Sequence, residues 1–496
     1  MRQFITACMA LVVAFTTAAH AQHPDPAHDS DTARLPANVT THQVLALPGL
    51  ELRFTATAGS IRLKDAKDAP LTDIAFVAYQ VEGADAATRP VTFVFNGGPG
   101  MASAWLQMGA LGPWRVQLDQ AADGPSAPPT PIPNAETWLD FTDLVFIDPP
   151  GTGYSRIVTP DGEARRRLWS VGGDISALAE AVRRWLDSNG RLMSPKYIVG
   201  ESYGGFRGPR LVRKLQSDEG VGVSGLVLLS PLLDAHVMSG YADPLRWVDL
   251  LPSEVASVRA RRGPVTRADL ADVEAYAAGD YLADILRGGD AAAIDRLTER
   301  VAGLTGFDRA LLRRLGGRLD RSIFQHEVTP GRVASVYDGT ITRPNPEPRE
   351  PDGPFPDPVL GGFEAPVSSA MVAVYSAKLN WHPDQVYHVS NSAAFSSWDW
   401  GRGIGRPESL SALQAARSVD PRIRVLVAQG LFDLVTPYFG TVLTLRLLPE
   451  LPGAAPIEMR VYPGGHMFYF GDSARAALHE DAKAVFDPAN ATWGSR

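Results

Sequence analysis

The chain is nearly free of cysteine. Its 496 residues include a single one, Cys8, which lies within an apolar stretch at residues 4–18. A disulfide framework and thiol chemistry are therefore excluded for the rest of the chain. The fold has to rely on a buried core instead, and a chain of this length is ample for a large one.

Long hydrophobic runs are also lacking beyond the N-terminus. Residues 4–18 are apolar but too few to span a bilayer as a stable helix. Arg2 precedes them, and the small-x-small sequence of residues 19–21 follows. This order predicts a signal peptide at residues 1–21, cleaved after Ala21. We therefore expect a periplasmic or secreted protein with no stable membrane association after cleavage; the alternative is a retained anchor.

Positive charge is not in excess. The chain has 47 Lys and Arg against 55 Asp and Glu, which gives a net charge of −8 at pH 7. Because the basic residues are mostly scattered, the electrostatic footprint of a nucleic-acid-binding protein is missing. His23 and His28 lack the spacing of metal ligands, so we expect no metal and no organic cofactor. The sequence leaves the oligomeric state open.

A nucleophile motif is present at Gly200-Glu201-Ser202-Tyr203-Gly204. It stands between a β-like run at residues 197–199 and a helix-like stretch at residues 206–215. Gly-x-Ser-x-Gly at a strand-to-helix turn is the nucleophile elbow of α/β-hydrolases, where the serine hydroxyl is exposed at a sharp turn. The motif predicts Ser202 as a nucleophile.

The partners of such a serine follow in the order that this fold requires. Asp433 comes after the mostly apolar run of residues 423–428, and His466 comes after the short run of residues 459–462. Both lie just past predicted strands, where open α/β sheets place their sites. An imidazole can take the serine proton, and a carboxylate holds the imidazole in the correct tautomer. We predict a catalytic triad of Ser202, Asp433 and His466.

A glycine-rich loop provides candidates for the oxyanion hole. The sequence Asn96-Gly97-Gly98-Pro99-Gly100 follows a strand-like run at residues 91–95. Glycines let backbone N–H groups approach a reacting carbonyl closely. We predict the N–H groups of Gly98 and Tyr203 as the oxyanion donors.

Five segments in this order resemble the serine carboxypeptidases, over residues 91–470. They are Asn96-Gly97-Gly98-Pro99-Gly100, Asp148-Pro149-Pro150-Gly151-Thr152-Gly153-Tyr154-Ser155, Gly200-Glu201-Ser202-Tyr203-Gly204-Gly205, the segment around Asp433, and Gly465-His466-Met467. The resemblance implies hydrolysis of C-terminal peptide bonds through an acyl-enzyme. Ser202 would be the nucleophile, His466 the general base and then acid, and Asp433 the orienting carboxylate.

The resemblance also implies that Asn96 and Glu201 bind the terminal carboxylate of a peptide substrate. A protonated Glu201 would donate a hydrogen bond to it, which favours activity at acidic pH. On the residues alone, Glu201 could instead be a structural carboxylate and Asn96 could only hold its loop. A cysteine-free exported chain resembles a bacterial-type member of the family.

Three parts of the sequence depart from the family pattern. Met101 stands where the family often has Cys, and Ala110 stands where it often has a second glutamate, three residues before Pro113. After Met467 come Phe468 and Tyr469 instead of small or proline-containing residues. The triad is untouched, but an esterase or acyltransferase remains an alternative to a carboxypeptidase. A binding protein on a hydrolase scaffold is a third, non-enzymatic alternative.

The apolar runs predict the fold class. Short continuous runs are typical of parallel strands buried on both faces, whereas alternation over residues 45–81 predicts antiparallel strands at one edge. Apolar residues at helical spacing predict a helix over residues 175–186. We expect an α/β-hydrolase fold, with a mostly parallel central sheet flanked by helices and a largely helical cap. The expected segments are a flexible lead-in (22–45), the core (46–233 and 367–496) and a cap insertion (234–366), for which an unrelated second domain is the alternative.

Overall fold

The computed structural model describes residues 34–118, 130–159, 162–235, 240, 243–349, 355–401 and 407–487. The predicted signal peptide at residues 1–21 lies outside these ranges. Within them, no helix combines the length and the apolar character that a membrane crossing needs.

The core is a ten-stranded sheet in the order β1-β2-β3-β7-β4-β9-β10-β13-β14, with β8 paired to β3. Strands β1 to β3 pair antiparallel at one edge, and β7, β4, β9, β10, β13 and β14 run parallel to one another. The strands are β1 (Val39–Leu47), β2 (Leu50–Lys64), β3 (Pro70–Val81), β4 (Val91–Phe95), β7 (Asp143–Ile147), β8 (Arg156–Ile157), β9 (Lys196–Glu201), β10 (Gly225–Leu229), β13 (Arg424–Gly430) and β14 (Ile457–Tyr462). The predicted antiparallel edge and parallel strands are confirmed.

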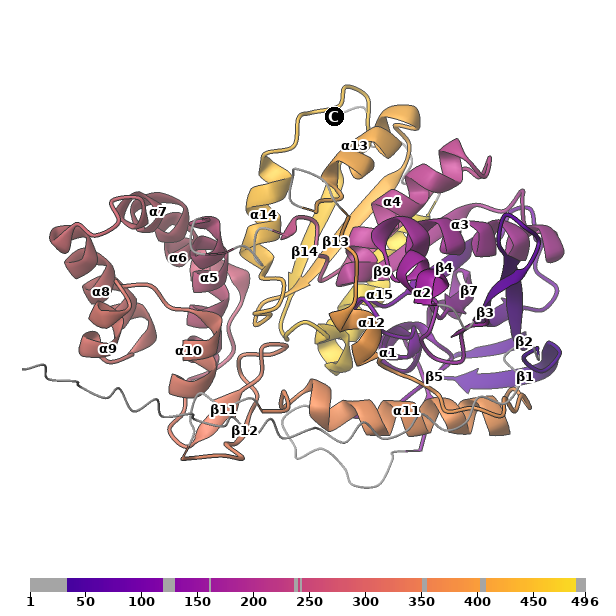
Figure 1. Cartoon of the computed structure of the whole chain (residues 1–496), viewed down its shortest axis with the longest axis horizontal. Helices are drawn as coiled ribbons and strands as arrows, with labels where there is room; N and C mark the ends of the chain where they lie inside the picture. The colour runs from indigo at the N-terminus through magenta and orange to yellow at the C-terminus, as the bar shows by residue number, and fades with distance from the viewer. Residues whose placement is uncertain are drawn as a thin grey trace, which may run out of the picture.

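Helices cover both faces of the sheet because alternate side chains of the parallel strands enter two different hydrophobic cores. One core joins Ile198 and Leu228 to α2, α3, α4 and α13, and the other joins Val199 and Leu229 to α1, η1, η6, α11 and α15 (Figure 1). These elements are α1 (Ala104–Leu106), η1 (Gln107–Leu111), α2 (Gly162–Leu168), α3 (Val171–Ser188), α4 (Tyr203–Ser217), α11 (Leu360–Ala377), α13 (Leu410–Val419), η6 (Phe468–Phe470) and α15 (Asp472–Phe486). Helix α3 confirms the helix expected over residues 175–186.

A lobe of short helices stands beside the sheet, on the left in Figure 1. Its helices are α5 (Leu245–Ala260), η4 (Arg267–Leu270), α6 (Ala271–Tyr276), η5 (Ala277–Tyr281), α7 (Leu282–Ile285), α8 (Ala291–Thr305), α9 (Arg309–Arg314) and α10 (Arg321–Glu327). Its core continues into Leu431, Phe432 and α14 (Tyr438–Arg446) of the sheet domain. The lobe therefore packs directly on the segment that carries Asp433.

Two of the expected segment boundaries differ from the structure. The lead-in was expected to be flexible through residue 45, but β1 starts at Val39 and pairs with β2. Its polar side chains fit an edge strand, where one side faces solvent while Leu45 is buried. The boundary at residue 366 falls inside α11, whose buried Phe363, Val367 and Met371 pack in the core of the sheet domain.

Candidate active site

Ser202 stands at the apex of the turn between β9 and α4, with backbone angles φ 58° and ψ −120°. A positive φ is strained for a residue with a side chain, and strain of this kind clusters at active sites. The turn is so tight that a Cβ at Gly200 would overlap the carbonyl oxygen of Gly204. Ser202 remains partly accessible while the glycines around it are buried. The elbow thus presents its serine to solvent.

Asp433 and His466 form a direct pair. The Nδ1 of His466 lies 2.7 Å from Oδ2 of Asp433, and Asp433 is 0% exposed. The backbone N–H groups of Val435 and Thr436 donate to its Oδ1 at 2.7 and 3.0 Å, and the Thr436 hydroxyl donates to Oδ2 at 2.8 Å. Burial lowers the pKa of His466, but the charge and hydrogen bond of Asp433 outweigh it, so the pKa is raised. With Nδ1 donating to Asp433, Nε2 can act as a base.

The triad residues lie at one edge of the sheet. Ser202 follows β9, Asp433 follows β13 and His466 follows β14, in a run of adjacent parallel strands whose carboxyl ends meet. The segment after β10 forms hydrogen bonds with both Ser202 and His466. Its Ser230 hydroxyl donates to the His466 carbonyl at 2.7 Å, and the Leu232 N–H donates to the Ser202 carbonyl at 3.0 Å.

The glycine-rich loop lies against the elbow. A Cβ at Gly97 would be only 2.5 Å from the Tyr203 nitrogen and 2.8 Å from the Ser202 Cβ, so no larger residue fits there. Within the described chain, the N–H groups of Gly98 and Tyr203 donate to no other backbone or side-chain group. Two amides without partners beside the serine hydroxyl are suited to hold an oxyanion.

Glu201 and Asn96 meet in a buried cluster next to the serine. The Asn96 amide donates to Oε2 of Glu201, and its Oδ1 accepts from the Leu106 N–H at 3.0 Å. Asn96 therefore holds its own loop and contacts Glu201 at the same time. Glu201 is 4% exposed, and this burial raises its pKa. A carboxyl that retains its proton can donate to an anion.

Tyr469 is a member of this cluster that the sequence analysis missed. Its hydroxyl donates to Oε1 of Glu201 at 2.7 Å. Its ring packs against η1, where a Cβ at Gly109 would be 2.7 Å from Cε2 of the tyrosine. Ala110, which replaces the glutamate of the family pattern, is in the same element. The unusual sequence after Met467 was the only sequence signal for this contact.

The loop at residues 335–341 of the insertion contacts both catalytic loops. It connects β11 (Arg332–Ala334) to β12 (Thr342–Pro344). The carbonyl of Val336 accepts from the Leu434 N–H at 3.0 Å, and the carbonyl of Tyr337 accepts from the His466 N–H at 2.5 Å. The Tyr337 ring lies 5.5 Å from the His466 ring. This loop, which we call the 335–341 loop, therefore positions the segments that carry Asp433 and His466, a role that no sequence motif indicated.

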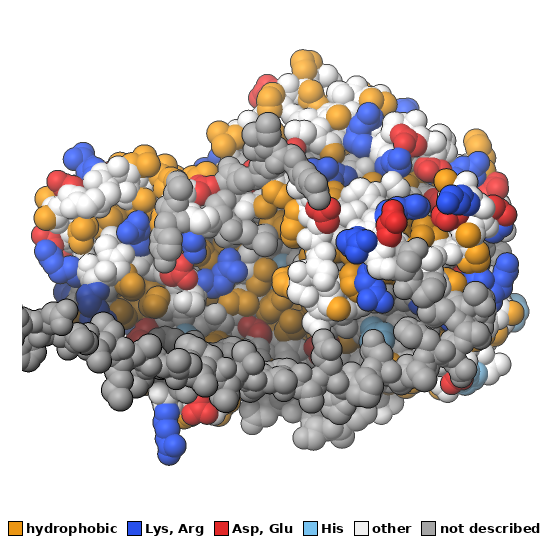
Figure 2. Space-filling view, viewed as in Figure 1, with side chains coloured by type: hydrophobic (Ala, Val, Ile, Leu, Met, Phe, Trp, Pro, Cys, Tyr) orange, Lys and Arg blue, Asp and Glu red, His pale blue; other side chains and the backbone are white. Residues whose placement is uncertain are grey.

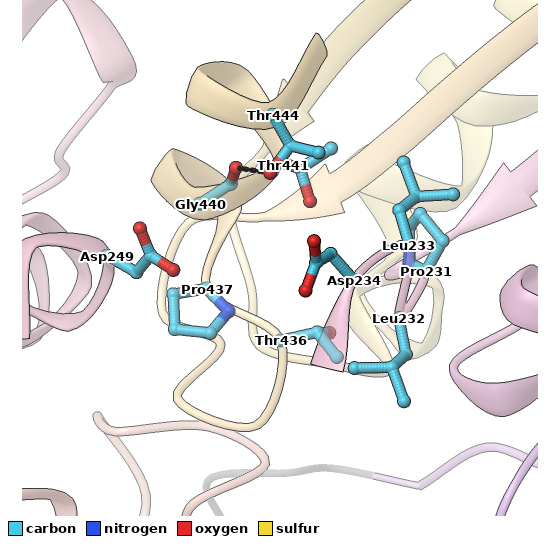
Figure 3. Close-up of a pocket in the computed structure, with 10 residues that line it drawn as sticks. All are labelled: Pro231, Leu232, Leu233, Asp234, Asp249, Thr436, Pro437, Gly440, Thr441 and Thr444. Atoms are coloured by element: carbon cyan, nitrogen blue, oxygen red, sulfur yellow. Dashed lines mark hydrogen bonds between the residues drawn. The ribbon is translucent and has the colours of Figure 1, made fainter. Parts of the chain in front are cut away.

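A small cavity of about 20 Å³ lies behind Thr436, between the segment after β10 and the helical lobe. Asp234, Asp249 and Thr436 are among its lining residues (Figure 3). It has room for about one water molecule and none for a peptide. Figure 2 shows hydrophobic side chains gathered between the helical lobe and the sheet domain. Among the residues described, no three His, Cys, Asp or Glu side chains cluster as metal ligands would.

Comparison with known proteins finds similarity over part of the chain. Residues 48–245 match the sequence model of the serine carboxypeptidase family. The chain is 26% identical over 211 residues to serine carboxypeptidase-like 10 of Arabidopsis thaliana, covering 40% of this chain and 46% of that protein. It is 30% identical over 148 residues to the pheromone-processing carboxypeptidase KEX1 of Yarrowia lipolytica, covering 29% of this chain and 22% of that protein. The matches thus span less than half the length of these relatives.

A solved structure extends the likeness to most of the fold. The prohormone-processing carboxypeptidase KEX1(delta)p of Saccharomyces cerevisiae aligns over 87% of this chain and 91% of its own, with a TM-score of 0.51 and 14% sequence identity. At such an identity, the alignment shows the fold alone. Together, the matches confirm the resemblance to the serine carboxypeptidases and the α/β-hydrolase fold. The family match includes Ser202 but ends before Asp433 and His466.

Proposed function

We propose that this relative of the serine carboxypeptidases is a serine-type carboxypeptidase, a hydrolase that removes residues from peptide C-termini through an acyl-enzyme on Ser202. The observation that carries the proposal is the buried Asp433–His466 pair at the same sheet edge as a strained serine elbow. The cluster of Asn96 and Glu201 beside that serine supports action at a chain end.

The reaction proceeds in two halves. The Ser202 hydroxyl attacks the scissile carbonyl while Nε2 of His466 takes its proton, and the oxyanion is held by the N–H groups of Gly98 and Tyr203. His466 then donates that proton to the leaving amine, which departs as the C-terminal residue. A water molecule, deprotonated by His466, hydrolyses the ester on Ser202 and restores the hydroxyl.

The terminal carboxylate of the substrate is bound by the Asn96–Glu201 cluster in this proposal. Asn96 and Tyr469 already donate to the two oxygens of Glu201. The proton of a neutral Glu201 is the group left to donate toward the substrate. Because burial raises the pKa of Glu201, this proton is retained to higher pH than in an exposed glutamate.

The proposal is tested by mass spectrometry of N-blocked dipeptides incubated with the purified mature protein, beside their C-terminally amidated forms. We expect release of the C-terminal residue from the free acids and at least ~10-fold slower release from the amides, because the amides lose the charge-assisted hydrogen bond. Equal cleavage of acids and amides would contradict carboxypeptidase specificity.

We also propose that the protein is exported to the periplasm or the medium. The mass of the intact mature protein is then expected to correspond to a chain that begins at Gln22.

An esterase or acyltransferase is the second candidate, and Ala110 favours it. The family pattern has a glutamate where this chain has a methyl group, so the carboxylate-binding set has lost one acidic member. An enzyme without strict end recognition would keep the triad and accept simple esters. Rapid turnover of esters with no hydrolysis of any N-blocked dipeptide would favour this candidate.

The pH dependence of kcat/KM is expected to differ between free-acid and ester substrates. Ester hydrolysis requires only neutral His466, so it rises as pH increases through the raised pKa of that histidine. Free acids also need protonated Glu201, so their rate falls again as pH increases through the pKa of Glu201, which burial raises. The optimum for free acids therefore lies at lower pH than the optimum for esters.

The Glu201→Gln variant tests this assignment. Glutamine cannot ionise, so the fall of the free-acid rate at higher pH is expected to disappear, while the ester profile keeps its shape. Glu163→Gln, at an exposed position on α2, is the matched control. An unchanged difference between the two profiles in Glu201→Gln would show that another group titrates.

A further inference from the structure

Arg321 is a cation that forms no hydrogen bond or ion pair within the described part of the chain. It is the first residue of α10, which lies with α5 on the side of the helical lobe nearest to the sheet (Figure 1). Its side chain is partly buried, and its Nε is shielded from solvent with no hydrogen-bond acceptor in the described chain. No carboxylate of the described residues forms an ion pair with it. A sheltered charge of this kind is costly unless a partner compensates it.

Three carboxyl groups, those of Asp433, Asp320 and Glu254, are near enough to act on the charge of Arg321. Asp320 pairs with Arg246 at 2.7 Å and accepts from the Ser322 N–H at 3.1 Å. Asp433 is occupied by His466 and by the residues after it in its own loop. Glu254 is buried, and this burial raises its pKa well above the usual value. Within the described chain, none of these carboxyl groups forms a hydrogen bond or an ion pair with Arg321.

Arg321 lies within electrostatic range of Asp433 and of Tyr337. Gln325 of α10 donates to the Ala334 carbonyl at 2.9 Å, which fixes the helix to β11, the strand that leads into the 335–341 loop. Tyr337 of that loop packs on the His466 ring at 5.5 Å. Burial lowers the pKa of Arg321, and the nearby charge of Asp433 acts against this effect. Burial raises the pKa of the Tyr337 hydroxyl, and the charge of Arg321 acts against this effect.

We propose that Arg321 binds a carboxylate of the substrate beside His466. The inference rests on the proposed function and adds a recognition residue from the insertion to it. A guanidinium binds a carboxylate through two parallel hydrogen bonds, which makes it selective for this group. Ala110 leaves the Glu201 cluster without the second glutamate of the family pattern, so an additional carboxylate-binding residue has a clear role. The bound group is either an acidic side chain next to the scissile bond or the terminal carboxylate.

The test compares kcat/KM for N-blocked dipeptides that carry Glu or Gln at the penultimate or the terminal position, each as free acid and as amide. The proteins compared are the wild type, the variant Arg321→Met and a matched control, Arg314→Met. Arg314 is an exposed arginine at the end of α9. If Arg321 binds an acidic side chain, the wild type prefers Glu over Gln by ~10- to 100-fold at one position. Arg321→Met then reduces that ratio to about one and leaves the Gln substrates unchanged.

If Arg321 binds the terminal carboxylate, Arg321→Met lowers kcat/KM ~10- to 100-fold for all free acids and leaves the amides unchanged. The inference is overturned if Arg321→Met retains both the Glu/Gln ratio and the acid/amide ratio of the wild type. Should Arg321→Met fail to fold, Arg321→Lys keeps the charge but loses the paired hydrogen bonds, and its ratios decide in the same way. A wild type that hydrolyses none of these peptides would contradict the proposed function itself.

Discussion

Replacing Ser202 by alanine is expected to lower kcat on a C-terminal peptide bond by about 10^4- to 10^6-fold. The elbow places the serine hydroxyl at the apex of a turn whose backbone is strained at φ 58°. Without that oxygen no acyl-enzyme can form, and His466 has no proton to take from the protein. The oxyanion donors and the substrate-binding groups remain, which leaves a small residual rate over water.

The loss is measured as kcat on an N-blocked dipeptide, with labelling by a serine-reactive fluorophosphonate as a second readout. Ser217→Ala, at the exposed end of the same helix α4, is the matched control and is expected to behave as the wild type. Turnover of Ser202→Ala near that of the control, or labelling that persists in it, would refute the acyl-enzyme mechanism.

Asp433→Asn is expected to lower kcat by about 10^4-fold at neutral pH with little change in KM. Oδ1 of Asp433 accepts from two backbone N–H groups, so the asparagine oxygen is favoured at that position. Its NH₂ group then faces Nδ1 of His466 and can only donate to it. The histidine proton is thereby forced onto Nε2, which can no longer accept the proton of Ser202.

The variant is compared with Asp420→Asn, which changes a carboxylate at the opposite end of β13 from Asp433. The pKa of His466 is raised in the wild type, with Asp433 as the cause that outweighs burial. Histidine NMR titration is therefore expected to give a lower pKa for His466 in Asp433→Asn than in the control. A kcat within about tenfold of the wild type would show that Asp433 does not orient the base.

Much of the parallel sheet could be predicted because its signals are local. The apolar runs at residues 91–95 and 226–229 correspond to β4 (Val91–Phe95) and β10 (Gly225–Leu229), since a strand covered on both faces is mostly apolar. The turn after β9 could be placed from its glycines, because backbone approaches at Gly200 and Gly97 leave no room for a Cβ. Signals of this kind depend on neighbours in sequence and on backbone geometry.

Other features have no local signal. β1 is stabilised by its ladder with β2, so its polar sequence resembled a flexible segment. Helix α11 is stabilised by an apolar stripe that packs on the sheet domain, across the expected domain boundary. Tyr469 reaches Glu201 over 268 positions of sequence, and such a distant pair cannot be inferred from the pattern around either residue.

By itself, the sequence determined the nucleophile elbow, the glycine-rich loop, the order of Ser202, Asp433 and His466, and the strands that carry them. Those features follow from steric demands of tight turns and from the burial of short apolar runs. Only the tertiary structure decided which groups surround the reacting atoms. The contact of Tyr469 with Glu201, that of the 335–341 loop with His466, and the sheltered Nε of Arg321 arise where distant segments pack together. Contacts of this kind depend on three-dimensional packing, which residue spacing does not encode.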